Sequence, residues 1–516
     1  MTFEVVKLRY CGFSSNISEN LRQIKNTIGN DLDFVVRVFN ILSDQRILKC
    51  AVVYINEMAD KSKLNSLSVE LNETILSETW DGLSVEDCFV KLKTSLLCQV
   101  KVSVKADIET LYDEVLSGNT ILLVDGMNQF LLLYTSGTEG RAIGETTSQT
   151  VIRGPKEAFT ENLNTNISRI RRIVKDKSLK IEKMSLGEKT KTKIAILYLE
   201  GIAKEEILNE LRARLNKIKV DSILDSGYIE EYIKDDPNSV FPEFLNSERP
   251  DTVSANLLEG KVAIFVEGSP YALTVPALFI DFLQVSEDYY HHYIISSFIR
   301  FVRYLALLLT LVVPALYIAL TTFHQEMIPT TLLVSIAAQR EGVPFPAFAE
   351  AFLMEIIFEI LREAGIRMPR AVGSAISIVG ALVLGQAAVQ AGIISAFIVI
   401  IVSITAIASF AIPNYELSNA IRLIRFAFMI LSACFGLFGI FICFVILILH
   451  LSKLKSFGVP YLTPFAPAEA IGNRDAVVRF PMWKMKYRPH VMVGAESVRV
   501  QIDPPLTDKR KDQEIF

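Results

Sequence analysis

The chain has few of the residues on which catalytic and metal sites depend. Its six cysteines include no CxxC pair, so the sequence supports neither a zinc site nor a thioredoxin-type motif. Only five histidines are present, all after residue 290, and no Ser/His/Asp or Cys/His arrangement stands out. No Gly-rich phosphate-binding spacing occurs either. We therefore expect neither an enzyme nor a bound cofactor or metal.

The chain also lacks a basic excess and an export signal. Its formal net charge is −4, and it shows no basic patch or stripe of the kind that binds nucleic acid. The first ten residues, MTFEVVKLRY, do not combine a charged start with an apolar stretch, so they do not form a signal peptide. Without one, the long charged region that follows is expected to lie in the cytosol.

The composition indicates a soluble half joined to a membrane half. Hydrophobic residues make up 51% of the 516 residues, and the mean hydropathy of +0.34 is typical of a chain partly embedded in a membrane. Charged residues still make up 21% and are concentrated in the first 290 positions. The predicted fold is an α+β soluble N-terminal half, an α-helical polytopic membrane domain at 291–455 and a tail at 456–516.

The soluble half repeats its own order of elements. Segments around Tyr54 and Asp125 resemble segments around Tyr198 and Glu267, at nearly equal separations. Self-similarity of this kind predicts two related α/β subdomains joined by a Gly- and Thr-rich linker. Chance likeness of short strand–turn–strand segments is the alternative. The predicted bounds are 1–136 for the first subdomain, 137–155 for the linker and 156–290 for the second subdomain.

Local patterns give the elements of each subdomain. Apolar residues at helical spacing predict helices, and Val- and Ile-rich runs predict strands. The predicted helices cover 14–29, 107–116, 160–174 and 204–218, and the predicted strands cover 34–42, 47–55, 120–124, 129–134, 179–184, 193–199, 262–266 and 272–275.

Long apolar runs in the second half predict helices that cross a membrane. Such a helix needs about 20 predominantly apolar residues, and several stretches reach this length. A segment at 330–364 is predicted to be amphipathic or re-entrant instead. The predicted spans are 304–323, 371–391, 393–412 and 423–450.

The uncharged stretch at 371–391 has two different faces. Small residues recur at every fourth position on one face, and such residues let helices approach closely in lipid. The opposite face carries two valines and then two glutamines. This face would line a path through the membrane, or else the helix is buried and its glutamines bond across the bundle. The predicted packing residues are Gly373, Ser377, Ala381 and Gly385, and the predicted pore-lining residues are Val379, Val383, Gln386 and Gln390.

Two carboxylates mark the amphipathic segment. Glu355 and Glu359 share one helix face because they lie four residues apart. An amphipathic helix usually lies in the membrane interface. If the helix is embedded instead, the two acids become candidates for attracting cations at a pore mouth, because carboxylates inside a membrane are functional by default. Both placements stay open from the sequence.

Several motifs resemble those of the A subunits of GerA-type spore germination receptors, over nearly the whole chain. The resemblance implies a multi-pass subunit in the inner membrane of a dormant spore, working with a permease-like B subunit and a lipoprotein C subunit. It also implies a homo-oligomer that acts as a ligand-gated cation channel. The motifs are GPKEAFTEN from Gly154, ERPD from Glu248, DYY from Asp288, REGVPFP from Arg340, IVGALVLGQAA from Ile378 and RFPMWK from Arg479.

Two other functions fit the same sequence. One is a paralogue of the same fold that amplifies ion release without sensing a nutrient, such as a SpoVAF-like protein. The other is a scaffold or signalling subunit whose membrane part never conducts. Loss of the response to one nutrient would indicate the receptor, whereas slower release for all nutrients would indicate the paralogue.

Overall fold

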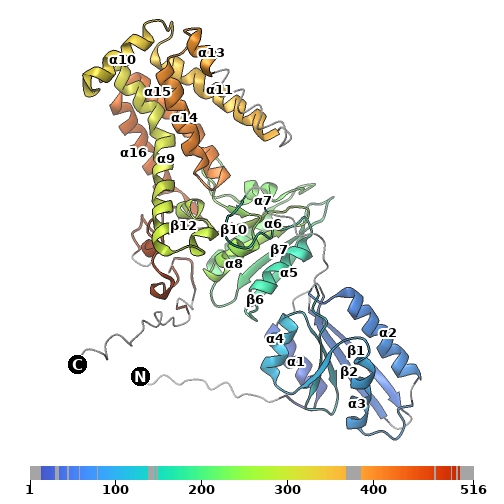
Figure 1. Ribbon diagram of the computed structural model, residues 1–516. Helices are drawn as coiled ribbons and strands as arrows, with labels where there is room; N and C mark the ends of the chain where they lie inside the picture. The colour runs from blue at the N-terminus through green and yellow to red at the C-terminus, as the bar shows by residue number, and fades with distance from the viewer. Residues whose placement is uncertain are drawn as a thin grey trace, which may run out of the picture.

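Two layered α/β subdomains and a bundle of helices follow one another along the chain (Figure 1). The second subdomain lies between the first and the bundle. The computed structural model describes residues 13–28, 34–43, 46–56, 58–77, 79–137, 146, 149–367, 385–469, 472–489, 491–494 and 498–499.

The first subdomain is built on an antiparallel sheet of five strands in the order β1-β2-β4-β5-β3. All five residues of β4 are buried. Because successive side chains point to opposite faces of a sheet, β4 is covered on both faces. The elements are α1 (Ile17–Ile28), β1 (Phe34–Ser43), β2 (Arg46–Ile55), α2 (Lys61–Ser77), α3 (Val85–Leu96), β3 (Val102–Lys105), α4 (Ile108–Leu116), β4 (Thr120–Val124) and β5 (Phe130–Leu133).

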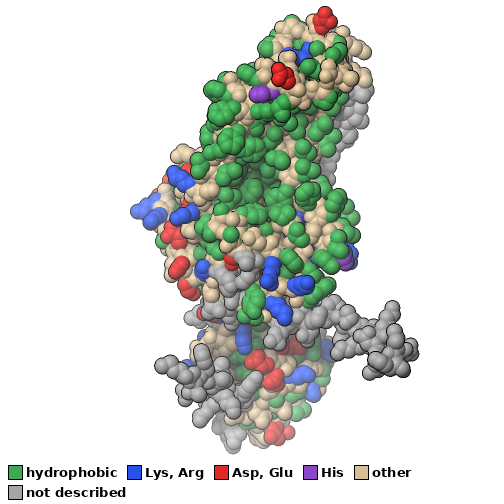
Figure 2. Space-filling view, turned by 90° about the vertical axis from the view of Figure 1, so that its left-hand side faces the viewer, with side chains coloured by type: hydrophobic (Ala, Val, Ile, Leu, Met, Phe, Trp, Pro, Cys, Tyr) green, Lys and Arg blue, Asp and Glu red, His purple; other side chains and the backbone are tan. Residues whose placement is uncertain are grey.

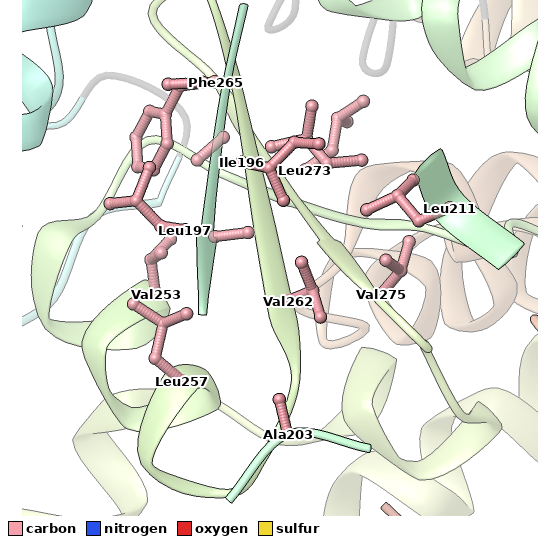
Figure 3. Packing of buried hydrophobic residues seen from close by; sticks show 14 of the residues in the cluster. Ile196, Leu197, Ala203, Leu211, Val253, Leu257, Val262, Phe265, Leu273 and Val275 are labelled. Atoms are coloured by element: carbon pink, nitrogen blue, oxygen red, sulfur yellow. The ribbon is translucent and has the colours of Figure 1, made fainter. Parts of the chain in front are cut away.

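The second subdomain has the same topology, with strands in the order β6-β7-β9-β10-β8. Val253 and Leu257 approach the sheet from one side and Leu211 from the other (Figure 3), so this sheet also lies between helices. The elements are α5 (Leu163–Ile173), β6 (Leu179–Leu186), β7 (Thr192–Leu199), α6 (Glu205–Lys217), α7 (Ser226–Ile233), β8 (Leu245–Ser247), α8 (Pro250–Leu258), β9 (Val262–Val266) and β10 (Ala272–Val275).

Both subdomains fix their first helix with the same contact. The Asp125 carboxylate, just after β4, accepts a hydrogen bond from the backbone N–H of Ile17 at 3.0 Å. The Glu267 carboxylate, just after β9, accepts one from the N–H of Leu163 at 3.2 Å. A carboxylate satisfies free N–H groups at a helix N-terminus and suits the helix dipole. The shared strand order and the shared cap confirm the prediction of two related α/β subdomains.

The helical half begins with α9, which runs from the second subdomain to the far end of the bundle (Figure 1). Among the described residues, α9 and α15 are long and apolar enough to cross a membrane, and α14 and α16 are shorter apolar helices. Of the predicted span at 371–391, only the last part is described, as α13. The helices are α9 (Tyr293–Thr322), α10 (Thr330–Arg340), α11 (Ala347–Arg367), α13 (Gly385–Gln390), α14 (Ala396–Phe410), α15 (Tyr415–Phe435) and α16 (Leu437–Lys453).

The prediction of one continuous span at 423–450 is wrong. α15 ends at Phe435, α16 begins at Leu437, and the two helices pack against each other. Gly436 between them has φ 62° and ψ −139°, a backbone conformation that needs glycine. The apolar run continues on both sides of this glycine, so hydropathy alone did not reveal the break.

The end of α16 returns to the second subdomain. The Ser456 hydroxyl, in the short hairpin of β11 (Lys455–Ser456) and β12 (Val459–Pro460), donates to the Glu243 carbonyl at 2.9 Å and accepts from the Ala277 N–H at 3.0 Å. The start of α9 and the end of α16 therefore lie at the same end of the bundle. The remaining short helices are the 3-10 turns η1 (Phe279–Leu283), η2 (Ser286–Tyr289), η3 (Gln325–Met327), η5 (Gly472–Asp475) and η6 (Met482–Lys484).

Replacement of Gly436 by alanine is expected to destabilise the helical half. A Cβ at Gly436 would lie 2.7 Å from Cε1 of His324, and the unusual backbone conformation alone costs about 1–3 kcal/mol for a residue other than glycine. Thermal unfolding of the detergent-solubilised chain would measure the loss. Gly365→Ala is the matched control, because no atom lies within 4 Å of a Cβ there. Equal midpoints for the two variants would contradict this account of the turn.

Candidate functional site

A buried cluster of charges joins the second subdomain, the start of α9 and the tail. The Arg300 side chain is fully buried. Its Nε lies 2.9 Å from Oδ2 of Asp288, and its Nη1 lies 2.7 Å from Oδ1 of Asp475. Arg303 reaches the same Asp288 oxygen at 2.8 Å. We call these four residues the junction. Buried charges of this kind are tolerated because each has a partner of opposite charge.

Tyr289 completes the junction with an aromatic ring. The guanidinium carbons of Arg300 and Arg479 each lie 5.4 Å from the centre of this ring, a favourable distance for cation–π contacts. Burial, and then the neighbouring Asp475 carboxylate, raise the pKa of Tyr289 well above its ordinary value. The phenol therefore keeps its proton, and it donates a hydrogen bond to Oδ2 of Asp475 at 2.6 Å.

Local backbone contacts direct Asp288 towards α9. In η2, the Asp288 carboxylate also accepts a hydrogen bond from the N–H of Val285 at 3.4 Å. Ser296, in the first turn of α9, donates to the Asp288 carbonyl at 2.6 Å. The His292 ring accepts from the N–H of Ile294 at the N-terminus of the helix. These contacts fix where α9 begins, and Arg300 then lies on the helix face that Asp288 meets.

The linker docks beside the junction. The Arg249 guanidinium binds both oxygens of Asp251, at 3.1 and 2.7 Å, and donates to the Pro155 carbonyl at 2.9 Å. The Tyr290 hydroxyl donates to the same Asp251 carboxylate at 2.6 Å. Gly154 lies so close to Tyr290 that a Cβ would be 2.5 Å from the ring. The linker is thereby held to the segment that supplies Asp288.

Sequence reasoning missed the junction, although several of its parts had been singled out. The GPKEAFTEN, ERPD, DYY and RFPMWK motifs meet there, but they served only to establish a resemblance. In the sequence, Arg300 and Arg303 are visible only as two charges that come just before the predicted span at 304–323. The available signal was that two arginines, three residues apart on an apolar helix, need acidic partners if they are buried.

A second charge cluster lies inside the bundle, between α11 and α15. Glu355 and Arg425 are both fully buried, and their side chains lie 2.8 Å apart. Glu359 lies 3.0 Å from Arg425 and also pairs with Arg422. α11 therefore packs into the bundle against α15, and both predicted carboxylates face arginines.

Arg425 is incompletely satisfied by these contacts. Its Nε and Nη1 have no hydrogen-bond partner among the described residues. Removing one partner of a buried ion pair typically costs about 3–5 kcal/mol because the other charge is left uncompensated. The contact between α11 and α15 is thus strong while the pairs are made and sensitive to any change that separates them.

The predicted packing and pore-lining residues are only partly described. Gly385 is buried on α13, where a Cβ would lie 3.7 Å from Cγ1 of Val399 on α14. Gln386 and Gln390 are exposed on the same short helix. Gly373, Ser377, Val379, Ala381 and Val383 lie outside the described residues.

A cavity of about 350 Å³ lies beside the junction, between α8, η1, η2 and the tail. Its charged walls are largely self-compensated: Lys261 pairs with Asp281 at 2.6 Å, and Glu259 pairs with Arg499. Within the part of the chain that the structure describes, no three His, Cys, Asp or Glu side chains are grouped to hold a metal ion.

Two acids meet where α7 approaches α15. Glu230 is half-buried, and the Glu416 carboxylate accepts a hydrogen bond from the Asn246 amide nearby. Burial, and then the Glu416 carboxylate, raise the pKa of Glu230 from its ordinary 4.5 to about 8, with Glu243 adding to the shift and Lys234 opposing it. The two carboxylates thus share a proton at neutral pH.

Comparison with known proteins identifies the family. The family model of the Bacillus/Clostridium GerA spore germination protein matches residues 22–491, so the chain belongs to this family. Spore germination protein KA of Bacillus subtilis (strain 168) is 46% identical over 490 residues, which are 94% of this chain and 88% of that protein. The chain is therefore an A subunit of a spore germination receptor, and such subunits are not enzymes.

Two further proteins are similar to the chain. The uncharacterized membrane protein YfkQ of Bacillus subtilis (strain 168) is 46% identical over 388 residues, 75% of this chain and 76% of that protein. A crystal structure of the N-terminal domain of the A subunit of the Bacillus megaterium spore germinant receptor GerK3 is 35% identical. The match covers 52% of this chain and 97% of the crystallised domain, with a TM-score of 0.41.

Loss of the Tyr290 hydroxyl is expected to weaken the docking of the linker. Tyr290→Phe removes a hydrogen bond to a charged acceptor, worth about 1.5–3 kcal/mol, and the urea midpoint of the solubilised chain should fall. Tyr228→Phe is the matched control, since Tyr228 is 43% exposed. A Tyr290→Phe midpoint that equals the control would show that this contact does not stabilise the site.

The raised pKa of Glu230 predicts a fall in stability with rising pH. The folded chain binds this proton more tightly than the unfolded chain, so its contribution to stability is full below pH 4.5 and is lost as pH approaches 8. Glu230→Gln should flatten the decline in thermal midpoint over this window. Glu231→Gln, at an exposed neighbouring position, should leave the decline unchanged. An identical decline in all three proteins would contradict the assignment.

Proposed function

We propose that the chain forms the ion pathway of a nutrient-responsive germination receptor, as a homo-oligomer that acts as a ligand-gated cation channel. The observation that carries the proposal is the exposure of Gln386 and Gln390 while Gly385 of the same helix packs against α14. Amide groups exposed to lipid lack hydrogen-bond partners and are costly. A water-filled path between subunits satisfies them.

The gate is assigned to Val379 and Val383. If the helical period of the sequence holds there, both valines share a face with Gln386 and Gln390, and the path would pass from valines to glutamines. A ring of valines contributed by several subunits closes a pore by excluding water from a narrow apolar constriction. In the open state the ring widens and water enters.

The charge cluster between α11 and α15 is proposed to hold the closed state. With Glu355 and Glu359 paired to arginines, neither carboxylate is free to attract a cation. Separation of α11 from α15 would release both acids towards the pathway. Because a ligand shifts a two-state equilibrium only through its different affinity for the two states, nutrient bound to a partner must favour the separated arrangement.

The proposed partners and location are those that the resemblance to the receptor family implies. A permease-like B subunit would bind the nutrient and a lipoprotein C subunit would complete the receptor, in the inner membrane of the spore. The soluble half and the tail, which share one end of the bundle, would face the cytosol.

An amplifying, SpoVAF-like paralogue is the second candidate. It is considered because the chain is as similar to the membrane protein YfkQ as to spore germination protein KA, at 46% identity in each case. Deletion of the gene would separate the candidates: a receptor subunit is needed for one nutrient, whereas an amplifier speeds release for all of them. A non-conducting scaffold is the outcome if no flux is found.

Val383→Ala is expected to leak potassium from loaded liposomes without any nutrient. Each buried CH₂ group contributes about 0.8 kcal/mol, so the loss of two at the gate should speed efflux roughly tenfold. Val445→Ala, at a 40% exposed position on α16, is the matched control and should behave as wild type. If liposomes that carry Val383→Ala release no potassium, either alone or with the B and C subunits and nutrient present, the channel is rejected in favour of the scaffold.

A further inference from the structure

A short segment of the tail lies against the foot of α9. The backbone N–H of Arg479 donates to the Ser297 hydroxyl at 3.0 Å, and its guanidinium donates to the His291 carbonyl at 3.0 Å. The Trp483 ring meets the Tyr293 ring edge to face, with centres 6.1 Å apart. These contacts hold the segment against the first turns of α9, which is long and apolar enough to cross a membrane.

The outer side of this segment is apolar. Val478 is 52% exposed, Phe480 37% and Met482 47%. The first turns of α9 next to it also expose large apolar side chains, and a broad hydrophobic surface covers the helical half, with Lys and Arg gathered where it ends (Figure 2). The exposed residues of these first turns are Ile294, Ile295, Phe298 and Phe301. The apolar surface of the tail therefore continues the hydrophobic surface of the helical half.

The same segment carries positive charge without acids. No Asp or Glu occurs in the sequence between Asp475 and Glu496. Lys484 and Lys486 are exposed, and no acid in the described part of the chain pairs with either of them. Both border the cavity beside the junction. Four of the five acids that line the cavity pair with a cationic side chain of the protein: Asp281 with Lys261, Glu259 with Arg499, Asp251 with Arg249 and Asp475 with Arg300.

We propose that this segment is a docking surface for anionic phospholipid headgroups. We call it the tail patch and define it as Val478, Phe480, Met482, Trp483, Lys484 and Lys486. An aromatic ring beside apolar side chains suits the boundary between headgroups and acyl chains. Lysines at that depth bind the phosphates of an anionic leaflet. A neutral protein surface would satisfy the apolar side chains but leave both ammonium groups uncompensated.

The tail patch is linked to the junction by neighbouring residues of the same segment, so headgroup binding would also restrain the junction. Asp475, three residues before the tail patch, pairs with Arg300, and Arg479 within the segment lies over the Tyr289 ring. A lipid-bound tail patch thus holds the junction at the membrane surface. This role does not depend on whether the helices conduct ions.

The two tryptophans of the chain permit a direct test. Trp80 lies in the first subdomain and is 5% exposed, so Trp80→Phe leaves Trp483 as the reporter. The full chain is reconstituted in phosphatidylcholine with increasing phosphatidylglycerol brominated next to the headgroup. We expect quenching of Trp483 at low phosphatidylglycerol content. In the double variant Lys484→Glu/Lys486→Glu, the phosphatidylglycerol content that gives half-maximal quenching should rise roughly tenfold. The reason is that each lysine near an anionic surface increases the affinity for it severalfold.

Controls separate lipid binding from misfolding and self-association. Lys217→Glu/Lys219→Glu has the same spacing at exposed positions of the second subdomain and should match the Trp80→Phe parent. Lys484→Gln/Lys486→Gln should give an intermediate shift if the reversed variant folds poorly. Absent quenching, or equal quenching by brominated phosphatidylcholine in every variant, would overturn the proposal. Quenching that falls as the protein-to-lipid ratio rises would also overturn the proposal, because it would show that a second copy of the chain covers the tail patch.

Discussion

The guanidinium of Arg300 lies fully buried between Asp288 and Asp475, and three parts of the chain meet on it. Asp288 belongs to the end of the second subdomain, Arg300 to the first long helix, and Asp475 to the tail that returns from α16. Because Asp288 and Asp475 balance Arg300 and Arg303, loss of any one of the four leaves a net charge in the buried cluster, which typically costs about 3–5 kcal/mol. The junction therefore makes the position of α9 depend on both the soluble half and the tail.

The two charge clusters lie at different levels of the helical half and fix different contacts. At the cytosolic end proposed here, the junction ties α9 to the second subdomain and, through Asp251 and Tyr290, to the linker. Deeper in the bundle, Glu355 and Arg425 tie α11 to α15. Ion pairs inside an apolar bundle have few intermediate arrangements, because a partly separated pair is worse than either a closed or a hydrated one. Such pairs suit a switch between two packings.

The sequence predicted those features that depend on local pattern and repetition. Related segments around Tyr54 and Tyr198 gave two subdomains of equal topology, since strand and helix periods are visible in the chain itself. The break at Gly436 was missed because apolar residues continue on both sides of it. The pairing of Glu355 with Arg425 was also missed, because helix packing selects partners that are far apart in sequence. The junction was missed for the same reason, since its arginines and acids belong to separate segments of the chain.

Hydrogen exchange of the full chain in lipid, wild type beside Arg300→Gln, tests the central claim most directly. If the junction couples the parts as described, the substitution removes protection together from η2, from the first turns of α9 and from the tail around Asp475. The first subdomain should keep its wild-type exchange, and Arg474→Gln, at an exposed position of the same tail, should change little. Loss of protection confined to α9, with η2 and the tail unchanged, would contradict the claim that Arg300 joins them.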